Sequence, residues 1–464
     1  EFSDDYDMGC TGCDSPSCTS CCESPGCGGG IAGGGRLLGS LASNLGWTHS
    51  AFGGLACGSG SCSAASCSSG CSGIFGGGRP CEDGCGDCDQ CNSCCGFYTD
   101  LWVSTGFTSN ANNPPSGLNF PLTFNDQDDE WVMNQLYLTL GRRVRSCGDS
   151  WDLGGRVDLL YGTDYFFTQA VGLETRQDGS PHWNSSNGPR STGAAFYGLA
   201  MPQAYLEVYA PVLGGINFKI GHFYTTIGYE SVMAPENFFY SHAYTMQYGE
   251  PFTHTGVLAE FSLTNKLSGH FGYTRGWDTW EDPNGTPGYL AGISWTPSDV
   301  ASLAATVHTG REDAAGINDR TVYSIVYTRQ LNPGLQYVLQ HDFGMESNAE
   351  FDGAFRADSA KWYGLNQYLF MDITEKVTAG MRFEWFRDQD NARVLGIPFE
   401  STVSGGNYWG YTLGLNWRPT NNLTVRPEVR WDESDVVPPA GNGMFGDFGD
   451  QNQLTFAFDM ILRF

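Results

Sequence analysis

The sequence predicts an all-β protein: a transmembrane, up-and-down antiparallel β-barrel of about 16 strands, preceded by an irregular N-terminal extension rich in cysteine and glycine. Three observations favour this fold. Apolar and polar residues alternate with a period of two over much of residues 97–464, short and long connections follow one another in turn, and no run of 18 or more apolar residues offers a spanning helix. We therefore divide the 464 residues into an extension, 1–96, and a barrel, 97–464.

The end of the chain shows the alternation most clearly. Phe456, Phe458 and Met460 alternate with Ala457 and Asp459, which puts apolar side chains on one face of an extended strand and small or polar ones on the other. A helix would mix these residue types on every face. Equivalent runs predict strands at 97–109, 130–143, 153–165, 200–212, 214–226, 252–264, 266–277, 288–297, 299–310, 319–331, 334–345, 360–373, 375–389, 406–418, 421–433 and 451–464.

The connections between these strands alternate in length. Short turns such as 211–214 are followed by long loops such as 227–251 and 345–359, so every turn lies at one rim and every loop at the other. Closing such a meander removes two edges that would invite aggregation. A propeller or a pair of β-sandwiches would need evenly spaced turns and a blade-length repeat, which the sequence lacks. Fourteen or 18 strands remain alternatives, because 97–109 is the weakest assignment.

Two further features are expected of a barrel this wide. Aromatic residues near strand ends, among them Trp362, Tyr408, Trp417 and Trp431, are predicted to form girdles at the membrane interfaces. The interior is too wide for side chains to fill and is expected to hold water.

The extension differs sharply from the barrel in composition, because it holds 16 of the 17 cysteines. The chain starts at Glu1 without a methionine, and we expect a mature end left after signal-peptide removal, in an oxidising compartment where thiols pair. The predicted disulfide residues are Cys10, Cys13, Cys18, Cys21, Cys22, Cys27, Cys57, Cys62, Cys67, Cys71, Cys81, Cys85, Cys88, Cys91, Cys94 and Cys95. Cys147 is left over and could bridge subunits or stay free.

Two cysteine spacings also fit metal centres. One matches a bacterial iron–sulfur cluster: Cys85, Cys88, Cys91 and Cys95. The other forms two C-x-x-C pairs suited to Zn²⁺: Cys10, Cys13, Cys18 and Cys21. Disulfides are favoured over both, because the compartment is oxidising and Gly96 stands where the cluster motif has proline. We predict no cofactor and no resident metal, although Ca²⁺ could bind the acidic external loops.

We interpret the extension as a periplasmic crosslinked module that ties the barrel to the cell wall, to a neighbouring protein or to itself. Two alternatives are a flexible low-complexity tail and a plug in which residues 31–52 enter the pore.

Four segments of the barrel carry a resemblance to a known family. They are WDLGGRVDLLYGTDY at 151–165, LEVYA at 206–210, KIGHFY at 219–224 and the stretch 228–242 with GYES and APENFFYSH. These segments resemble the putative beta-barrel porin-2 family of outer-membrane proteins. The resemblance implies a channel in the bacterial outer membrane for passive diffusion of small hydrophilic solutes and ions. Likeness to general porins implies a homotrimer surrounded by outer-membrane lipid, and the terminal Phe464 is similar to the signal for barrel assembly.

In general porins the third long loop folds into the lumen, so we expect residues 227–251 to form the constriction. The loop is rich in aromatic residues and carries the acids Glu230, Glu236 and Glu250. Pro235 suits the first position of a short helix opened by Ala234. An external cap or a subunit contact is the alternative for this loop.

Strand parity predicts a set of charged residues that face the pore, since charge facing lipid is costly. They are Arg156, Asp158, Glu207, Lys219, Arg382, Glu384, Arg426, Glu428 and Arg430, with Glu260, Asp432 and Asp459 beside them. Arginines opposite a loop of carboxylates would create a transverse field that selects polar solutes. Alternatively, the arginines pair with acids on adjacent strands and only stiffen the wall.

Other functional classes fit less well. A net charge of −27 leaves no basic patch for nucleic acid. No G-x-S-x-G, H-E-x-x-H or P-loop pattern occurs, so we predict no enzyme, although a barrel lipase could assemble its residues without a motif. The main alternative function is structural: an abundant barrel in a crosslinked surface lattice, anchored by the cysteine-rich segment.

Overall fold

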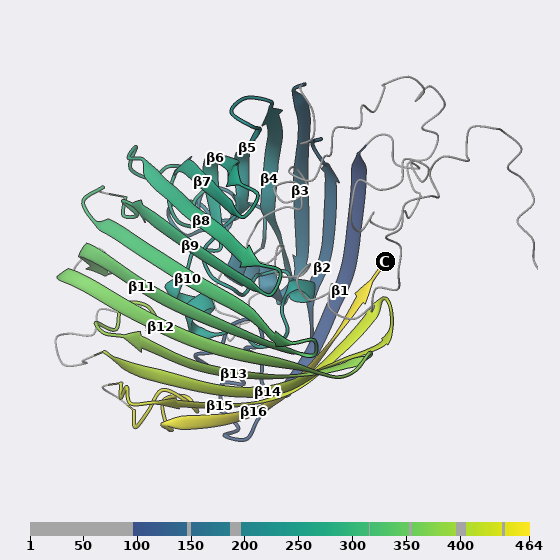
Figure 1. The fold of residues 1–464 in the computed structure, drawn as a ribbon. Coiled ribbons are helices and arrows are strands. Elements are labelled where there is room, and N and C mark those ends of the chain that lie inside the picture. The colour runs from purple at the N-terminus through teal and green to yellow at the C-terminus, as the bar shows by residue number, and fades with distance from the viewer. Residues whose placement is uncertain are drawn as a thin grey trace, which may run out of the picture.

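The computed structural model describes residues 96–145, 150–185, 196–314, 316–351, 355–395, 405–438 and 441–464. In this part of the chain sixteen strands form one closed antiparallel barrel, which confirms the predicted fold (Figure 1). The cysteines and the segment 31–52 lie outside the described residues. The disulfides, the two metal alternatives and the plug therefore stay predictions.

The strands follow one another around the barrel in chain order. Their bounds are β1 Phe97–Asn110, β2 Glu130–Arg142, β3 Asp152–Gly162, β4 Gly198–Ala210, β5 Ile216–Tyr224, β6 Thr253–Thr264, β7 Leu267–Thr274, β8 Gly288–Ser298, β9 Ala301–Gly310, β10 Asp319–Asn332, β11 Leu335–Phe351, β12 Phe355–Thr374, β13 Val377–Asp388, β14 Gly406–Thr420, β15 Leu423–Ser434 and β16 Asn452–Arg463. Short helices occur at η2 Thr163–Thr168, η4 Ala234–Glu236 and η5 Thr245–Gly249.

The first and last strands close the barrel. β1 pairs antiparallel with β16, with Gly106 opposite Asp459 and Phe107 opposite Phe458. The weakest strand assignment is therefore correct, and pairing across the seam leaves no open edge in the sheet.

Side chains alternate between the two faces of each strand as predicted. On β13, Met381 is 47% exposed while its neighbour Arg382 is fully buried. On β16, Phe456 is 54% exposed and Ala457 only 6%. Apolar side chains thus cover the outside of the barrel, and the charged residues lie on its inner face, where lipid cannot reach them.

Three predictions about the strands were wrong. The loop expected at 345–359 is largely strand, because the backbone pairing between β11 and β12 continues to Phe351 and Phe355. The strand expected at 153–165 ends at Gly162, because the chain turns into the short helix η2 from Thr163. Trp362 and Tyr408 are fully buried and face inward, so neither belongs to a girdle.

The inside of the barrel is occupied by connections from its loop rim. We name them L1 (111–129), L2 (163–197, of which the structure describes 163–185 and 196–197) and L3 (225–252). Leu122 and Phe124 of L1 and Tyr244 of L3 are almost completely buried, and the short helices lie within the ring of strands (Figure 1). Among the described residues, none of the helices has the length and apolar character that a bilayer crossing requires.

Candidate channel constriction

L3 leaves the barrel wall after Tyr224 and returns at Thr253. Between these points it crosses the interior and contacts strands far away around the ring. The indole N–H of Trp362 on β12 donates to the Gly249 carbonyl at 3.0 Å, and the Gln135 amide on β2 donates to the Val232 carbonyl at 2.7 Å. The third long loop therefore lies inside the barrel, and the predicted short helix with Pro235 is present as η4.

Three arginines on the inner wall hold the backbone carbonyls of L3. Arg382 on β13 donates to Ser241 at 2.7 Å, and Arg430 on β15 donates to His242 at 2.8 Å. Arg426 on β15 donates through one nitrogen to three carbonyls, those of Ala234, Asn237 and Phe239, at 2.7–3.0 Å. Hydrogen bonds from a charged donor are stronger than neutral ones, so these contacts fix the path of L3.

Two carboxylates on the same wall hold the backbone N–H groups of L3. Glu428 accepts from Tyr240 at 2.9 Å and from Ser241 at 3.1 Å, and Glu384 accepts from Tyr244 at 2.6 Å. The wall therefore satisfies donors and acceptors of a segment that has little regular structure, which a buried loop requires.

Glu230 of L3 forms the main ion pair between the loop and the wall. Its carboxylate accepts from Arg382 at 2.9 Å and from the Tyr368 hydroxyl at 3.0 Å, and it lies 3.2 Å from the His242 ring. Burial alone would raise the pKa of Glu230, but Arg382 and His242 outweigh it and lower that pKa to about 2. Arg382 and His242 thus hold the Glu230 carboxylate in its charged form.

Glycines on the inner wall accommodate the aromatic side chains of L3. A Cβ atom at Gly380 would overlap the ring of Phe238, and one at Gly106 would overlap the ring of Tyr240. At Gly414 a Cβ would come within 3.1 Å of Phe239. Sequence reasoning missed these positions, although glycine at an inward position of a strand is a signal of close approach.

The residues predicted to face the pore all lie on the inner face or in L3, but they are not gathered at one place. Arg156 and Asp158 pair on β3 at 2.7 Å, and Lys219 on β5 pairs with Glu260 on β6 at 2.9 Å. Glu207 on β4 accepts from Asn217 at 2.6 Å. Glu236 is half-buried in η4, and Glu250 lies at the end of L3, against β11.

The arginines near L3 are ion-paired. Arg426 binds Asp459 at 2.6 Å, and Arg430 binds Glu384 at 2.9 Å and Asp432 at 2.8 Å. Arg426 and Asp459 lie on adjacent strands, as the stiff-wall alternative expects. By contrast, Asp432 shares β15 with Arg430, and Glu384 lies two strands away on β13. Whether these residues also act on permeating ions stays a prediction.

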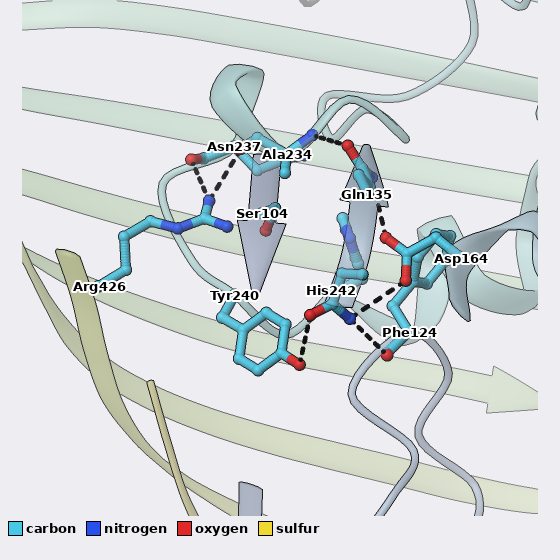
Figure 2. Close-up of a pocket in the computed structure, with 10 residues that line it drawn as sticks. Ser104, Phe124, Gln135, Asp164, Ala234, Asn237, Tyr240, His242 and Arg426 are labelled. Carbon is cyan, nitrogen blue, oxygen red and sulfur yellow. Dashed lines mark hydrogen bonds between the residues drawn. The ribbon is translucent and has the colours of Figure 1, made fainter. Parts of the chain in front are cut away.

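L1 and L2 support L3 from the side of β1 and β2. Phe124 of L1, Asp164 of L2 and Tyr240 of L3 surround a cavity of about 10 Å³ (Figure 2), enough for one water molecule. The Gln135 amide donates to Asp164 at 2.8 Å, and Asn134 accepts from the Tyr240 hydroxyl at 3.0 Å. A polar junction thus joins the three loops inside the barrel.

Histidines hold the first residues of L3, a role that sequence reasoning did not assign. The Thr225 hydroxyl lies 3.0 Å from His254 Nε2 on β6, and the Thr226 hydroxyl lies 3.0 Å from His270 Nε2 on β7. Within the described part of the chain, no group of three or more histidine, cysteine, aspartate or glutamate residues could hold a metal ion.

Comparison with known proteins identifies the family. The family described as putative beta-barrel porin-2, OmpL-like, matches residues 96–464. The chain belongs to this family. It is therefore an outer-membrane porin, a channel for passive diffusion in the bacterial outer membrane. No curated protein matches the porin.

Several solved structures are similar to this porin over most of its length. OmpT of Vibrio cholerae, described in a trimer form, is 9% identical with a TM-score of 0.48, and the match covers 79% of this chain and 99% of OmpT. The channel DcaP of Acinetobacter baumannii is 12% identical with a TM-score of 0.48, covering 79% and 97%. An anion-selective porin from Comamonas acidovorans is 9% identical with a TM-score of 0.49, covering 79% and 99%.

Proposed function

We propose that L3 is a fixed constriction and that small hydrophilic solutes and ions diffuse past it. The observation that carries this proposal is the set of wall contacts to the L3 backbone, made by Arg382, Arg426 and Arg430 to carbonyls and by Glu384 and Glu428 to N–H groups. A loop held in this way narrows the barrel at one depth, and the barrel needs such a fold-in to be selective. We further propose that the protein catalyses no reaction.

Planar-bilayer recordings test the constriction. Wild-type porin is expected to give stepwise openings. The double variant Arg426→Gln, Glu428→Gln is expected to give larger steps, because residues 234–241 lose the charged contacts that these two side chains make with them. In liposome-swelling assays, the double variant is then expected to let larger sugars pass than the wild-type porin does. The control is Glu433→Gln on the same strand, whose side chain is exposed.

The outcomes separate the alternatives. Unchanged step size in the double variant, with heat-modifiable mobility showing a folded barrel, would contradict the constriction. No steps from the wild-type protein would favour the structural lattice.

We also propose a homotrimer, as the Vibrio cholerae OmpT structure is described. The outward faces of β2, β3 and β4 present exposed Leu140, Leu153 and Leu206, an aliphatic surface suited to packing against another copy. Crosslinking in native outer membranes is expected to give a trimer band, and a monomer band alone would contradict the proposal.

A further inference from the structure

The two ends of L3 meet at the side chain of Glu250. Glu250 lies three residues before the start of β6 and is 4% exposed. At the other end of the loop, Gly228 has a φ of +89°, and a Cβ atom there would overlap the Glu250 carboxylate. We call the place where Gly228 and Glu250 lie side by side the neck of L3, and the Glu250 side chain crosses it. Gly228 is needed there both for its backbone conformation and for space.

Beyond the neck, the Glu250 carboxylate meets a second buried carboxylate on the wall. Gln340 on β11 donates its side-chain amide to Glu250 Oε1 and, at 2.8 Å, to Asp342 Oδ2. One amide nitrogen thus brings the two acids together. Asp342 is fully buried, and its other oxygen, Oδ1, has no hydrogen-bond partner among the described residues.

The pair differs from Glu230 and Glu384, two other acids that contact L3, because it has no counter-charge. Glu230 binds Arg382, and Glu384 binds Arg430. Neither Glu250 nor Asp342 forms an ion pair within the described part of the chain. Two buried carboxylates at one site cannot both be ionised without a large cost, and the usual solution is to share a proton.

Burial and the absence of a paired cation among the described residues favour the protonated form of Glu250. Ser324 on β10 lies opposite Asp342 in the strand register, is 2% exposed and contributes only a hydroxyl. Burial raises the pKa of Glu250 well above its ordinary value, and Asp342 and then Glu230 raise it further. The other titratable groups that act on the pair are Glu230, which is paired with Arg382, and His341, whose ring stacks on Tyr323 at 5.8 Å on the outer face of the barrel.

We propose that Glu250 and Asp342 share one proton, bound between Asp342 Oδ1 and the Glu250 carboxylate, and that this proton site locks the neck of L3 to β11. In alkaline solution hydroxide removes the proton as water, two like charges remain side by side, and the neck separates from the wall. The site itself is independent of transport; its effect on conductance rests on the proposed constriction.

Infrared difference spectroscopy tests the proton site without any transport assay. The refolded porin is expected to show a protonated-carboxyl C=O band at neutral pH that disappears on alkaline titration. The double variant Glu250→Gln, Asp342→Asn keeps the shapes and hydrogen-bonding groups and is expected to lose this band, whereas Glu433→Gln keeps it. Absence of the band from the wild-type protein, or its persistence in the double variant, would overturn the proposal.

A bound cation is the competing explanation for two close carboxylates, and the same samples exclude or establish it. If Na⁺ or Ca²⁺ occupied the site, the band would be missing and thermal stability at neutral pH would rise with the salt concentration in the wild-type protein but not in the double variant. This result would overturn the shared proton.

Bilayer recordings then test the lock. Wild-type conductance is expected to rise over the pH interval in which the band is lost, and the double variant is expected to give a constant conductance over that interval. If the band titrates and the conductance does not follow it, the proton site stands and the lock is wrong. If the Arg426→Gln, Glu428→Gln variant also leaves the conductance unchanged, L3 is not the constriction and the proposed function fails instead.

Discussion

L3 is held in different ways on the two sides of the barrel. On β13 and β15 its middle meets buried charges, such as Arg382 and Glu428, that bind backbone carbonyls and N–H groups. On β6 and β7 its first residues meet histidines, and Thr225 and Thr226 offer only hydroxyl groups to His254 and His270. The first side combines ion pairs with hydrogen bonds, and the second uses single hydrogen bonds between side chains.

The comparison indicates what each side contributes. Each member of a buried ion pair needs the other, because removing one partner leaves the other charge uncompensated. A hydrogen bond to a hydroxyl group can be replaced by water or by a similar side chain at small cost. The charged side therefore determines where L3 lies, and the histidine side adjusts how its first residues enter the interior.

The largest effect is expected from Arg382→Met. This change removes the arginine that pairs with Glu230 and frees the Ser241 carbonyl. Glu230 keeps His242 and the Tyr368 hydroxyl, whereas Glu384 keeps Arg430. Breaking a buried ion pair in this way costs about 3–5 kcal/mol. Urea unfolding of the porin in lipid vesicles, followed by tryptophan fluorescence, measures the loss in the free energy of unfolding.

Two variants sharpen this measurement. Arg463→Met removes an exposed arginine instead of a buried one: the Arg463 side chain is 48% exposed and binds Asp100 at the turn rim. This variant is expected to change the free energy of unfolding by less than about 1 kcal/mol. Adding Glu230→Gln to Arg382→Met should restore part of the loss, because one uncompensated charge is removed. A loss for Arg382→Met no greater than that for Arg463→Met would show that the wall charges do not hold L3.

Much of the fold could be predicted because lipid and water impose a simple rule on each strand. Charge facing lipid is penalised, so the inward direction of Arg382, Arg426 and Glu428 followed from parity alone. Strand parity, applied strictly, would also have corrected the prediction that Trp362 belongs to an interfacial girdle. Trp362 shares parity with Asn366, a buried residue of the same strand, and so faces inward despite its place near a strand end.

The contacts of the constriction could not be predicted in the same way. Arg426 binds three backbone carbonyl oxygens of L3. Because every residue has a backbone carbonyl group, no sequence pattern indicates which residues Arg426 binds. The Glu250–Asp342 pair joins residues 92 positions apart, brought together only by the path of L3. Gly380 is a glycine on the inner face of a strand, so the sequence could have indicated that another group packs closely against it. The sequence could not have indicated that this group is the Phe238 ring.

The smaller effect is expected from His254→Leu on the histidine side. The His254 Nδ1–H donates to the Gly276 carbonyl at 3.0 Å, which leaves Nε2 to accept from the Thr225 hydroxyl. Leucine fills the space and leaves both partners unsatisfied, at a cost of about 1–3 kcal/mol. His254→Gln can donate and accept at similar positions and is expected to recover most of the loss in the same unfolding measurement. Equal losses for leucine and glutamine would mean that packing against the His308 ring, 4.7 Å away, and not the hydrogen bond to Thr225, is what His254 contributes to the entry of L3.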